Sequence, residues 1–227
     1  LLYIGAKIKF ADIDPRTMNI SIPSVKKLIS KKTKAIVCVH YGGLPCEMDE
    51  LKKLSKKYKI PIIEDAAHAM GARYKGKTIG SISDFTTFSF QAIKHFTTGD
   101  GGMLTIKDKN LLKKGKRLRW FGIDREGKQN GTWENDVYET GYKYQMTDIA
   151  ATLGFDSLLE FNKILIHRRK IFNVYLNELS KNKNIFCIND QDKNKFHSAW
   201  LFTISLEKKI IYKKNYENTE LKLIKYI

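Results

Sequence analysis

The chain has 227 residues, 42% of them hydrophobic, and a formal net charge of +17 at neutral pH. This composition supports a sizeable core, and the sequence contains no apolar run long enough for a helical membrane span. The positive charge would suit nucleic acid or an acidic small molecule, but no Arg-rich arm, paired-cysteine zinc pattern or aromatic RNA-binding signature accompanies it. We therefore expect neither a nucleic acid nor a membrane as partner.

The three cysteines are irregularly spaced, and Cys38 lies in the apolar run AIVCVH, where a buried free thiol is the expected state. The opening stretch LLYIGAKIKF is too polar for a signal peptide and begins inside a strand-like pattern without Met. We expect a cytoplasmic location and a chain that is a piece of a longer protein.

Short apolar runs alternate with amphipathic runs of about ten residues along the first half of the chain. This alternation is typical of βαβ units and predicts an α/β fold with a mostly parallel sheet flanked by helices. The expected strands are 6–14, 35–41, 60–65, 84–90 and 101–107, and the expected helices are 21–32, 48–58 and 111–122.

The pattern changes at Thr147, a suitable N-cap for one long helix that continues to about residue 180. Gly154 is the expected weak point of that helix. The following chain is polar, with one strand predicted at 199–207 and a helical pattern at 213–227. We therefore divide the chain into a major domain (1–150), a connecting helix (151–180) and part of a small C-terminal α+β domain (181–227).

Three residues whose side chains could take part in a reaction lie at or just after the ends of predicted strands. Asp65 closes 60–65, Ser89 lies in 84–90, and Lys94 follows five residues later. Ligands of open parallel sheets bind at the carboxyl ends of the strands. Pyridoxal phosphate (PLP) needs a lysine amine for a Schiff base and a carboxylate beside its ring nitrogen, while a hydroxyl such as that of Ser89 suits its phosphate.

Taken singly, these residues also have ordinary explanations. An acidic pair after an apolar strand commonly begins a loop, and the GDGG that follows Lys94 is typical of a tight turn. Composition and spacing alone therefore leave the PLP site as one hypothesis among several.

The complete strings are more specific. The stretch 61–104, PIIEDAAHAMGARYKGKTIGSISDFTTFSFQAIKHFTTGDGGML, resembles the DegT/StrS-like family of PLP-dependent nucleotide-sugar aminotransferases. The strings VHYGGLPCEMDEL upstream and ETGYKYQMTDIAATLG downstream also match family patterns, in order, so that the similarity covers about 5–159. The resemblance implies the major domain of fold type I of the PLP-dependent transferases, within the aspartate aminotransferase superfamily.

Carried over by position, the resemblance implies that Lys94 forms the Schiff base and that Asp65 pairs with the pyridine nitrogen. It further implies that Ser89 contacts the cofactor phosphate and that His68 lies near the cofactor hydroxyl. Related sugar dehydratases have His in place of the lysine, so Lys94 argues against that chemistry; His95 is its neighbour and does not replace it.

The family also implies a homodimer with active sites at the subunit interface. Its GYNYR segment supplies an Asn to the phosphate bound by the neighbouring subunit, whereas this chain reads GYKYQ and has Lys143 there. A lysine would reach a phosphate as a point charge. An exposed surface lysine is the alternative. The family's Gly-Thr segment, whose backbone binds the phosphate, would precede residue 1.

These observations favour an aminotransferase that moves an amino group from an amino acid, expected to be glutamate, to a keto-deoxysugar of a nucleotide sugar, in amino-sugar or polysaccharide biosynthesis. One alternative is a PLP-dependent sugar dehydratase or another enzyme of fold type I. A second is a truncated, inactive homologue that serves as a binding or dimerisation module. The sugar, the nucleotide and the aminated carbon stay open.

Overall fold

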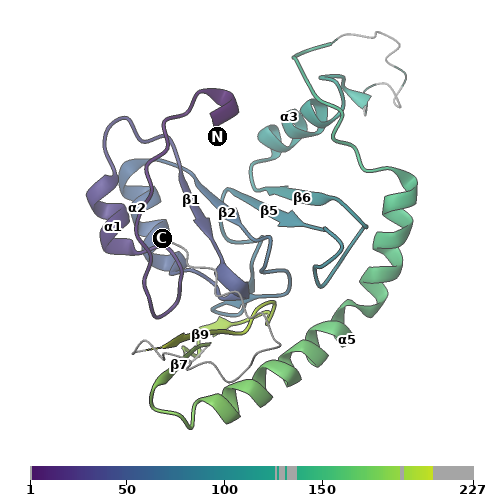
Figure 1. The fold of residues 1–227 in the computed structure, drawn as a ribbon. Helices are drawn as coiled ribbons and strands as arrows, with labels where there is room; N and C mark the ends of the chain where they lie inside the picture. The colour runs from purple at the N-terminus through teal and green to yellow at the C-terminus, as the bar shows by residue number, and fades with distance from the viewer. Residues whose placement is uncertain (1, 126, 128–130, 132–136, 190–191, 207–227) are drawn as a thin grey trace, which may run out of the picture.

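The structure is a computed structural model that describes residues 2–125, 127, 131, 137–189 and 192–206. Its central sheet has the order β1-β2-β5-β6, formed by β1 (Ile36–Val39), β2 (Ile62–Asp65), β5 (Phe85–Ser89) and β6 (Gly102–Ile106). β1, β2 and β5 run parallel, whereas β6 pairs with β5 in the antiparallel direction. The predicted α/β fold with a mostly parallel sheet is confirmed (Figure 1).

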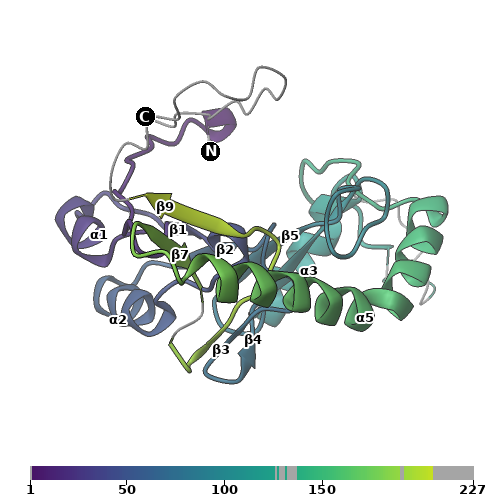
Figure 2. The ribbon, with the colours of Figure 1, turned by 60° about the horizontal axis from the view of Figure 1, so that its bottom comes forward.

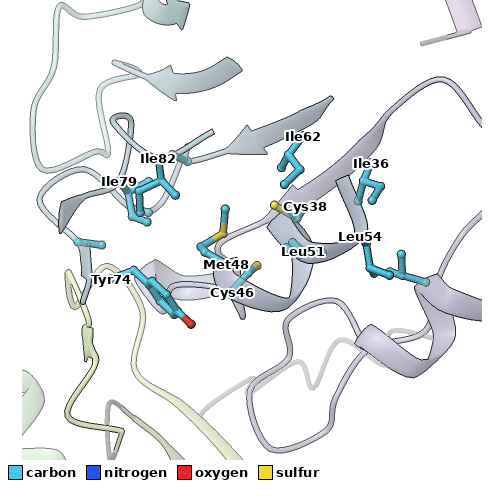
Figure 3. Packing of buried hydrophobic residues seen from close by; sticks show 14 of the residues in the cluster. Ile36, Cys38, Cys46, Met48, Leu51, Leu54, Ile62, Tyr74, Ile79 and Ile82 are labelled. Atoms are coloured by element: carbon cyan, nitrogen blue, oxygen red, sulfur yellow. The ribbon is translucent and has the colours of Figure 1, made fainter. Parts of the chain in front are cut away.

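Two helices, α1 (Ile22–Leu28) and α2 (Met48–Tyr58), cover one face of this sheet (Figure 1). The core lies between them and the strands, where Leu51 of α2 is fully buried and Ile62 of β2 almost fully (Figure 3). Burial alternates along β1 and β2, as expected when a single face of a strand packs on a core. The polar edge of α2 is lysine-rich and exposed, which accounts for part of the positive charge.

A single long helix, α5 (Asp148–Leu179), follows the sheet and curves past it to a separate β-hairpin-like pair (Figures 1 and 2). The Thr147 side chain accepts a hydrogen bond from the Ala150 N–H, as expected for an N-cap. The helix is continuous through Gly154. The smaller elements are η1 (Leu2–Ile4), η2 (Tyr41–Gly43), β3 (Arg73–Tyr74), β4 (Lys77–Thr78), α3 (Lys109–Arg119), β7 (Ile185–Ile188), β8 (Lys195–Phe196) and β9 (Thr203–Leu206).

One predicted strand is wrong. Residues 6–12 form no strand, and only Ile13 makes an isolated bridge, to Ile20. The alternation of apolar and polar residues is present, but Phe10 is 88% exposed and no described strand lies beside this stretch. A strand needs a partner for its backbone hydrogen bonds, so alternation alone is not sufficient.

The C-terminal part also differs from expectation. The strand predicted at 199–207 begins only at Thr203, as β9, and its predicted last residue lies outside the described residues. β9 pairs with β7, in a segment for which no strand was expected. The predicted helix at 213–227 lies outside the described residues. The division into domains stays a prediction. Among the described residues, the structure has no helix that combines the length and the apolar character needed to cross a membrane.

Candidate active site

Two of the predicted site residues end neighbouring strands of the sheet. Asp65 is the last residue of β2 and lies between Val39 of β1 and Thr87 of β5 in the strand register. Ser89 is the last residue of β5. Because β1, β2 and β5 are parallel, their carboxyl ends meet at one edge of the sheet, and the loops that follow them form the candidate site there.

The loop after β5 carries Lys94 and is compact. Its two ends are joined by hydrogen bonds from the Thr98 N–H to the Phe90 carbonyl (3.0 Å) and from the Phe90 N–H to the Gly101 carbonyl (2.8 Å). A Cβ at Gly101 would lie 2.4 Å from the Thr98 Oγ1, so the glycine-rich turn permits a close approach within the loop. The backbone of this loop is therefore fixed around Lys94.

Lys94 is half-buried, and its charge interacts with that of Asp65. Burial lowers the pKa of the Lys94 amine below its ordinary value of 10.5, and the attraction of Asp65 opposes this shift. A larger fraction of this amine is therefore uncharged at neutral pH than of an exposed lysine. An uncharged amine is the form that attacks a carbonyl carbon and accepts a proton.

His68 lies in the loop after β2 and is held in one orientation. Its Nδ1 accepts a hydrogen bond from the Gly42 N–H (3.3 Å). Burial, with the positive charge of Lys94 as the second cause, lowers the pKa of His68 below 6.5, against the opposing effect of Asp65. A neutral imidazole that accepts at Nδ1 carries its proton on Nε2, so Nε2 is available as a hydrogen-bond donor to a ligand oxygen.

Asp65 and Ser89 each keep free hydrogen-bonding capacity. Asp65 accepts one bond at Oδ1 from the Ala67 N–H (3.0 Å). The Ser89 Oγ accepts from the Gln91 N–H (3.4 Å), and its own proton finds no acceptor among the described residues. The carboxylate can thus accept a proton donor of a ligand, and the hydroxyl can donate to an anion.

Lys143 does not join this group in the described part of the chain. It is exposed and makes an isolated bridge to Trp120, with its Nζ 5.6 Å from the centroid of the Trp120 ring. The structure therefore brings Asp65, His68 and Lys94 together, places Ser89 at the adjacent strand end, and leaves Lys143 elsewhere.

Sequence reasoning missed Trp200. Its indole lies 3.8 Å from the His68 ring, nearly parallel to it (13°), and the Lys94 Nζ lies 4.1 Å from the indole centroid. The only signal in the sequence was an isolated Trp at the start of an apolar run more than 100 residues after Lys94, and chain position gives no indication of such a contact.

The residues present fit PLP. A half-buried lysine of lowered pKa and a carboxylate with a free oxygen are the two groups that its aldehyde and its ring nitrogen require. The donor available on His68 Nε2 suits its ring hydroxyl, and the free hydroxyl of Ser89 suits its phosphate. These four side chains thus match the aldehyde, the ring nitrogen and the ring hydroxyl of the cofactor and part of its phosphate. The phosphate oxygens that Ser89 does not reach have no partner among them.

The chain is similar in sequence to curated proteins whose names give their activity. The chain is 39% identical over 208 residues to the UDP-4-amino-4,6-dideoxy-N-acetyl-beta-L-altrosamine transaminase of Campylobacter jejuni, covering 90% of this chain and 54% of the relative. It is 34% identical over 202 residues to the GDP-perosamine synthase of Escherichia coli, covering 89% and 53%. The chain thus spans about half the length of these curated relatives.

The fold has close counterparts among solved structures. A putative sugar aminotransferase of Streptococcus pneumoniae, solved in its PMP form, superposes with a TM-score of 0.79 at 31% identity, covering 91% of this chain and 57% of that one. The same protein has also been solved in its PLP form. The profile of the DegT/DnrJ/EryC1/StrS aminotransferase family matches residues 1–222. This chain belongs to the DegT/DnrJ/EryC1/StrS aminotransferase family.

Proposed function

We propose that this chain forms the cofactor-binding part of a PLP-dependent aminotransferase that transfers an amino group from an amino acid, glutamate in our prediction, to a keto-deoxysugar of a nucleotide sugar. The product would enter amino-sugar or polysaccharide biosynthesis. The observation that carries the proposal is that Lys94 and His68, in the loops after β5 and β2, both contact the Trp200 indole, while Asp65 ends β2 at the same edge of the sheet. The relatives named above act on nucleotide sugars according to their names, with UDP in one and GDP in the other, so the nucleotide stays open.

Each residue has a distinct part in this proposal. Bound PLP would supply an electron sink for the carbon that loses and regains a proton. The Lys94 Nζ would bind the cofactor covalently in the resting state and, once released by the incoming amine, would move that proton. The Asp65 carboxylate would keep the ring nitrogen protonated, because a negative charge beside a cation favours both charges. His68 Nε2 would donate to the ring hydroxyl, and Ser89 to the phosphate.

Lys143 would complete the phosphate site of a second subunit. Its exposure and its lack of contact with the other four residues agree with a role outside its own site. We propose a homodimer on this basis and on the family resemblance of the GYKYQ segment. We propose a cytoplasmic location because the cysteines Cys38, Cys46 and Cys187 are free.

The first test is spectroscopic. The full-length protein, purified with PLP, should show the visible absorbance band of a lysine–PLP Schiff base, and the Lys94→Ala variant should lose it. Lys52→Ala, which removes an exposed lysine of α2, should keep the band. A band that is unchanged in Lys94→Ala would refute the assignment.

The second test separates the candidate reactions. An aminotransferase should convert glutamate to 2-oxoglutarate with repeated turnover only when a nucleotide-linked keto sugar is present, because without this acceptor the reaction stops after one equivalent per bound cofactor. Loss of water from the sugar without amine transfer would favour the dehydratase alternative. Binding of PLP without either reaction in the full-length protein would favour the inactive binding module.

A further inference from the structure

Trp200 makes three contacts with the residues around the proposed cofactor anchor. Its indole stacks on His68 with 3.8 Å between ring centroids, and the Lys94 Nζ lies 4.1 Å from the indole centroid. The indole Nε1 also donates a hydrogen bond to the carbonyl of Ile93, the residue before the lysine (3.4 Å). One side chain thus contacts the charged end of Lys94, the backbone beside it, and the neighbouring imidazole.

The segment that carries Trp200 is bonded to the loop after β1. The Ser198 N–H donates to the Gly43 carbonyl and the Leu201 N–H donates to the Gly42 carbonyl, each at 3.0 Å. A Cβ at Gly43 would lie 2.1 Å from the Ser198 Oγ, so only glycine permits this approach. These two segments, more than 150 residues apart in the sequence, are therefore held together by hydrogen bonds between their backbones.

The same segment is bonded to the two other loops of the site. The Ser198 hydroxyl donates to the His68 carbonyl (2.8 Å), and the Trp200 Nε1 donates to the Ile93 carbonyl in the loop that carries Lys94 (3.4 Å). Ala199 has a φ of 58°, a left-handed conformation that non-glycine residues seldom adopt. Such a conformation persists only where the surroundings enforce it, and here it turns the chain so that Trp200 reaches Lys94.

Two effects of the indole on the lysine act in opposite directions. As an apolar neighbour it removes water from the amine, which favours the uncharged form. As an aromatic ring it attracts the ammonium to its negative face, which favours the charged form and fixes the position of the nitrogen. A purely aliphatic side chain of similar bulk would keep the first effect and lose the second, so the two can be separated by substitution.

We propose that Trp200 is a positioning residue of the reaction: its indole, fixed by the segment 198–201, holds the Lys94 nitrogen beside Asp65 and His68 through a cation–π contact. This inference rests on the proposed function, in which Lys94 is the residue that binds the cofactor. Its test uses the amine of the cofactor-free protein, so the positioning role can fail while the proposed function stands.

The test compares Trp200→Phe with Trp200→Leu. The pKa of the Lys94 amine is measured in the full-length, cofactor-free protein from the pH dependence of its acetylation by trace acetic anhydride, read by peptide mass spectrometry. Phe keeps an aromatic face and should leave this pKa near that of the parent. Leu should lower it, with up to about tenfold more free amine at a given pH below the pKa.

Two internal controls make the comparison specific. Lys57, whose Nζ lies 5.3 Å from the exposed Tyr58 ring, should keep the same pKa in all variants. Trp120→Leu, which removes the indole next to Lys143, should leave the pKa of Lys94 unchanged. Equal pKa values of Lys94 in Trp200→Phe and Trp200→Leu would overturn the proposal, because Trp200 would then only exclude water from the amine, without a cation–π contact.

If circular dichroism shows that Trp200→Leu does not fold, Ser198→Ala takes its place. This variant keeps the indole but removes the hydroxyl that ties the segment to the His68 carbonyl. A loosened segment should weaken the cation–π contact and lower the pKa of Lys94 in the same direction. An unchanged pKa in Ser198→Ala would then overturn the proposal.

Discussion

Glu64 and Asp65 are neighbours in the chain but point to opposite faces of β2, because successive side chains of a strand alternate. Asp65 faces the candidate site, whereas Glu64 is fully buried and accepts a hydrogen bond at 2.7 Å from His40 Nε2. The Glu64 carboxylate also accepts from the Ser83 N–H and from the Thr86 hydroxyl. Of the two acidic residues, Asp65 is thus available to a ligand, whereas Glu64 joins neighbouring segments of the sheet through buried hydrogen bonds.

The buried hydrogen bonds around Glu64 continue through His40 to the loop after β1. His40 Nδ1 accepts from the Cys46 N–H (3.0 Å), and the His40 backbone N–H donates to the Asp65 carbonyl (3.0 Å). Burial opposes ionisation of Glu64, but its hydrogen bonds, that from His40 first, outweigh this effect and hold the pKa of Glu64 below its ordinary value of 4.5. The loop that positions His68 is therefore braced by a buried acid–imidazole pair.

Replacing Glu64 with Gln should destabilise the protein by about 3 kcal/mol, because one of the amide's two ends cannot accept the bonds that a carboxylate oxygen accepts. The stabilisation from Glu64 is present above pH 4.5 and is lost as the pH falls through its lowered pKa. Urea unfolding at several pH values should therefore show a smaller acid-induced loss of stability in Glu64→Gln than in the parent.

Glu50→Gln is the matched control. Glu50 forms an exposed ion pair with Lys53 on α2, so its replacement should leave the unfolding midpoint unchanged at neutral pH. The buried pair would have no stabilising role if the two variants unfolded at the same urea concentration.

At the scale of elements, α5 does more than connect two parts of the chain. The Gly154 position brings the helix close to the loop that carries Lys94: a Cβ there would lie 2.7 Å from the Thr98 Cγ2. Three residues further along α5, the Ser157 hydroxyl accepts a hydrogen bond from the Thr97 N–H (3.0 Å). Gly154, the expected weak point of the helix, is therefore a contact point for the loop that carries Lys94.

Gly154→Ala should destabilise the protein, although alanine favours a helix over glycine by about 1 kcal/mol. The added methyl group meets Thr98, whose rotamer is fixed because its hydroxyl donates to the Asp100 carbonyl (2.8 Å). Thermal unfolding should show a lower midpoint for Gly154→Ala. The double variant Gly154→Ala with Thr98→Ser, which removes the methyl group but keeps the hydroxyl, should recover most of the loss, and an unaltered midpoint in the single variant would contradict the close contact.

Much of the fold could be predicted from the sequence, because local patterns specify it. α2 was predicted with its observed bounds, and the N-cap at Thr147 follows from residue type alone. The strand at 6–14 was wrong since a strand depends on a partner elsewhere in the molecule. In the candidate site, the positions of Asp65 at a strand end and of Lys94 shortly after one follow from local patterns, whereas Trp200 reaches Lys94 and His68 through long-range contacts that no local pattern records.

At the scale of the whole molecule, several large apolar side chains of the described residues are exposed on β1 and α5. Val37 and Val39 of β1 are 38% and 44% exposed on the face of the sheet opposite α1 and α2. The first half of α5 also exposes large apolar residues, among them Phe155 (68%) and Leu159 (65%). Apolar area of this extent on a helix is typical of a contact surface with another protein segment.

We expect part of this α5 surface to lie in the proposed homodimer. Sedimentation velocity of the full-length protein should give a dimer, and Phe155→Glu should shift the equilibrium toward the monomer by placing a charge in an apolar contact. Lys56→Glu, a charge change on exposed α2, is the control and should leave the dimer intact. A monomeric parent protein at micromolar concentration would contradict the expectation.

The bonds made by Ser198 and Trp200 also determine the order in which the site is completed. They join residues 130 and 107 positions apart, to His68 and to Ile93 respectively. Protein synthesis proceeds from the N-terminus, so the lysine and its strand leave the ribosome long before the residues that hold it. Lys94 is therefore synthesised early, but its side chain is positioned only later, when Ser198 and Trp200 form their contacts. We expect the ability to retain a cofactor to arise only at that stage of folding, when contacts of high sequence separation form.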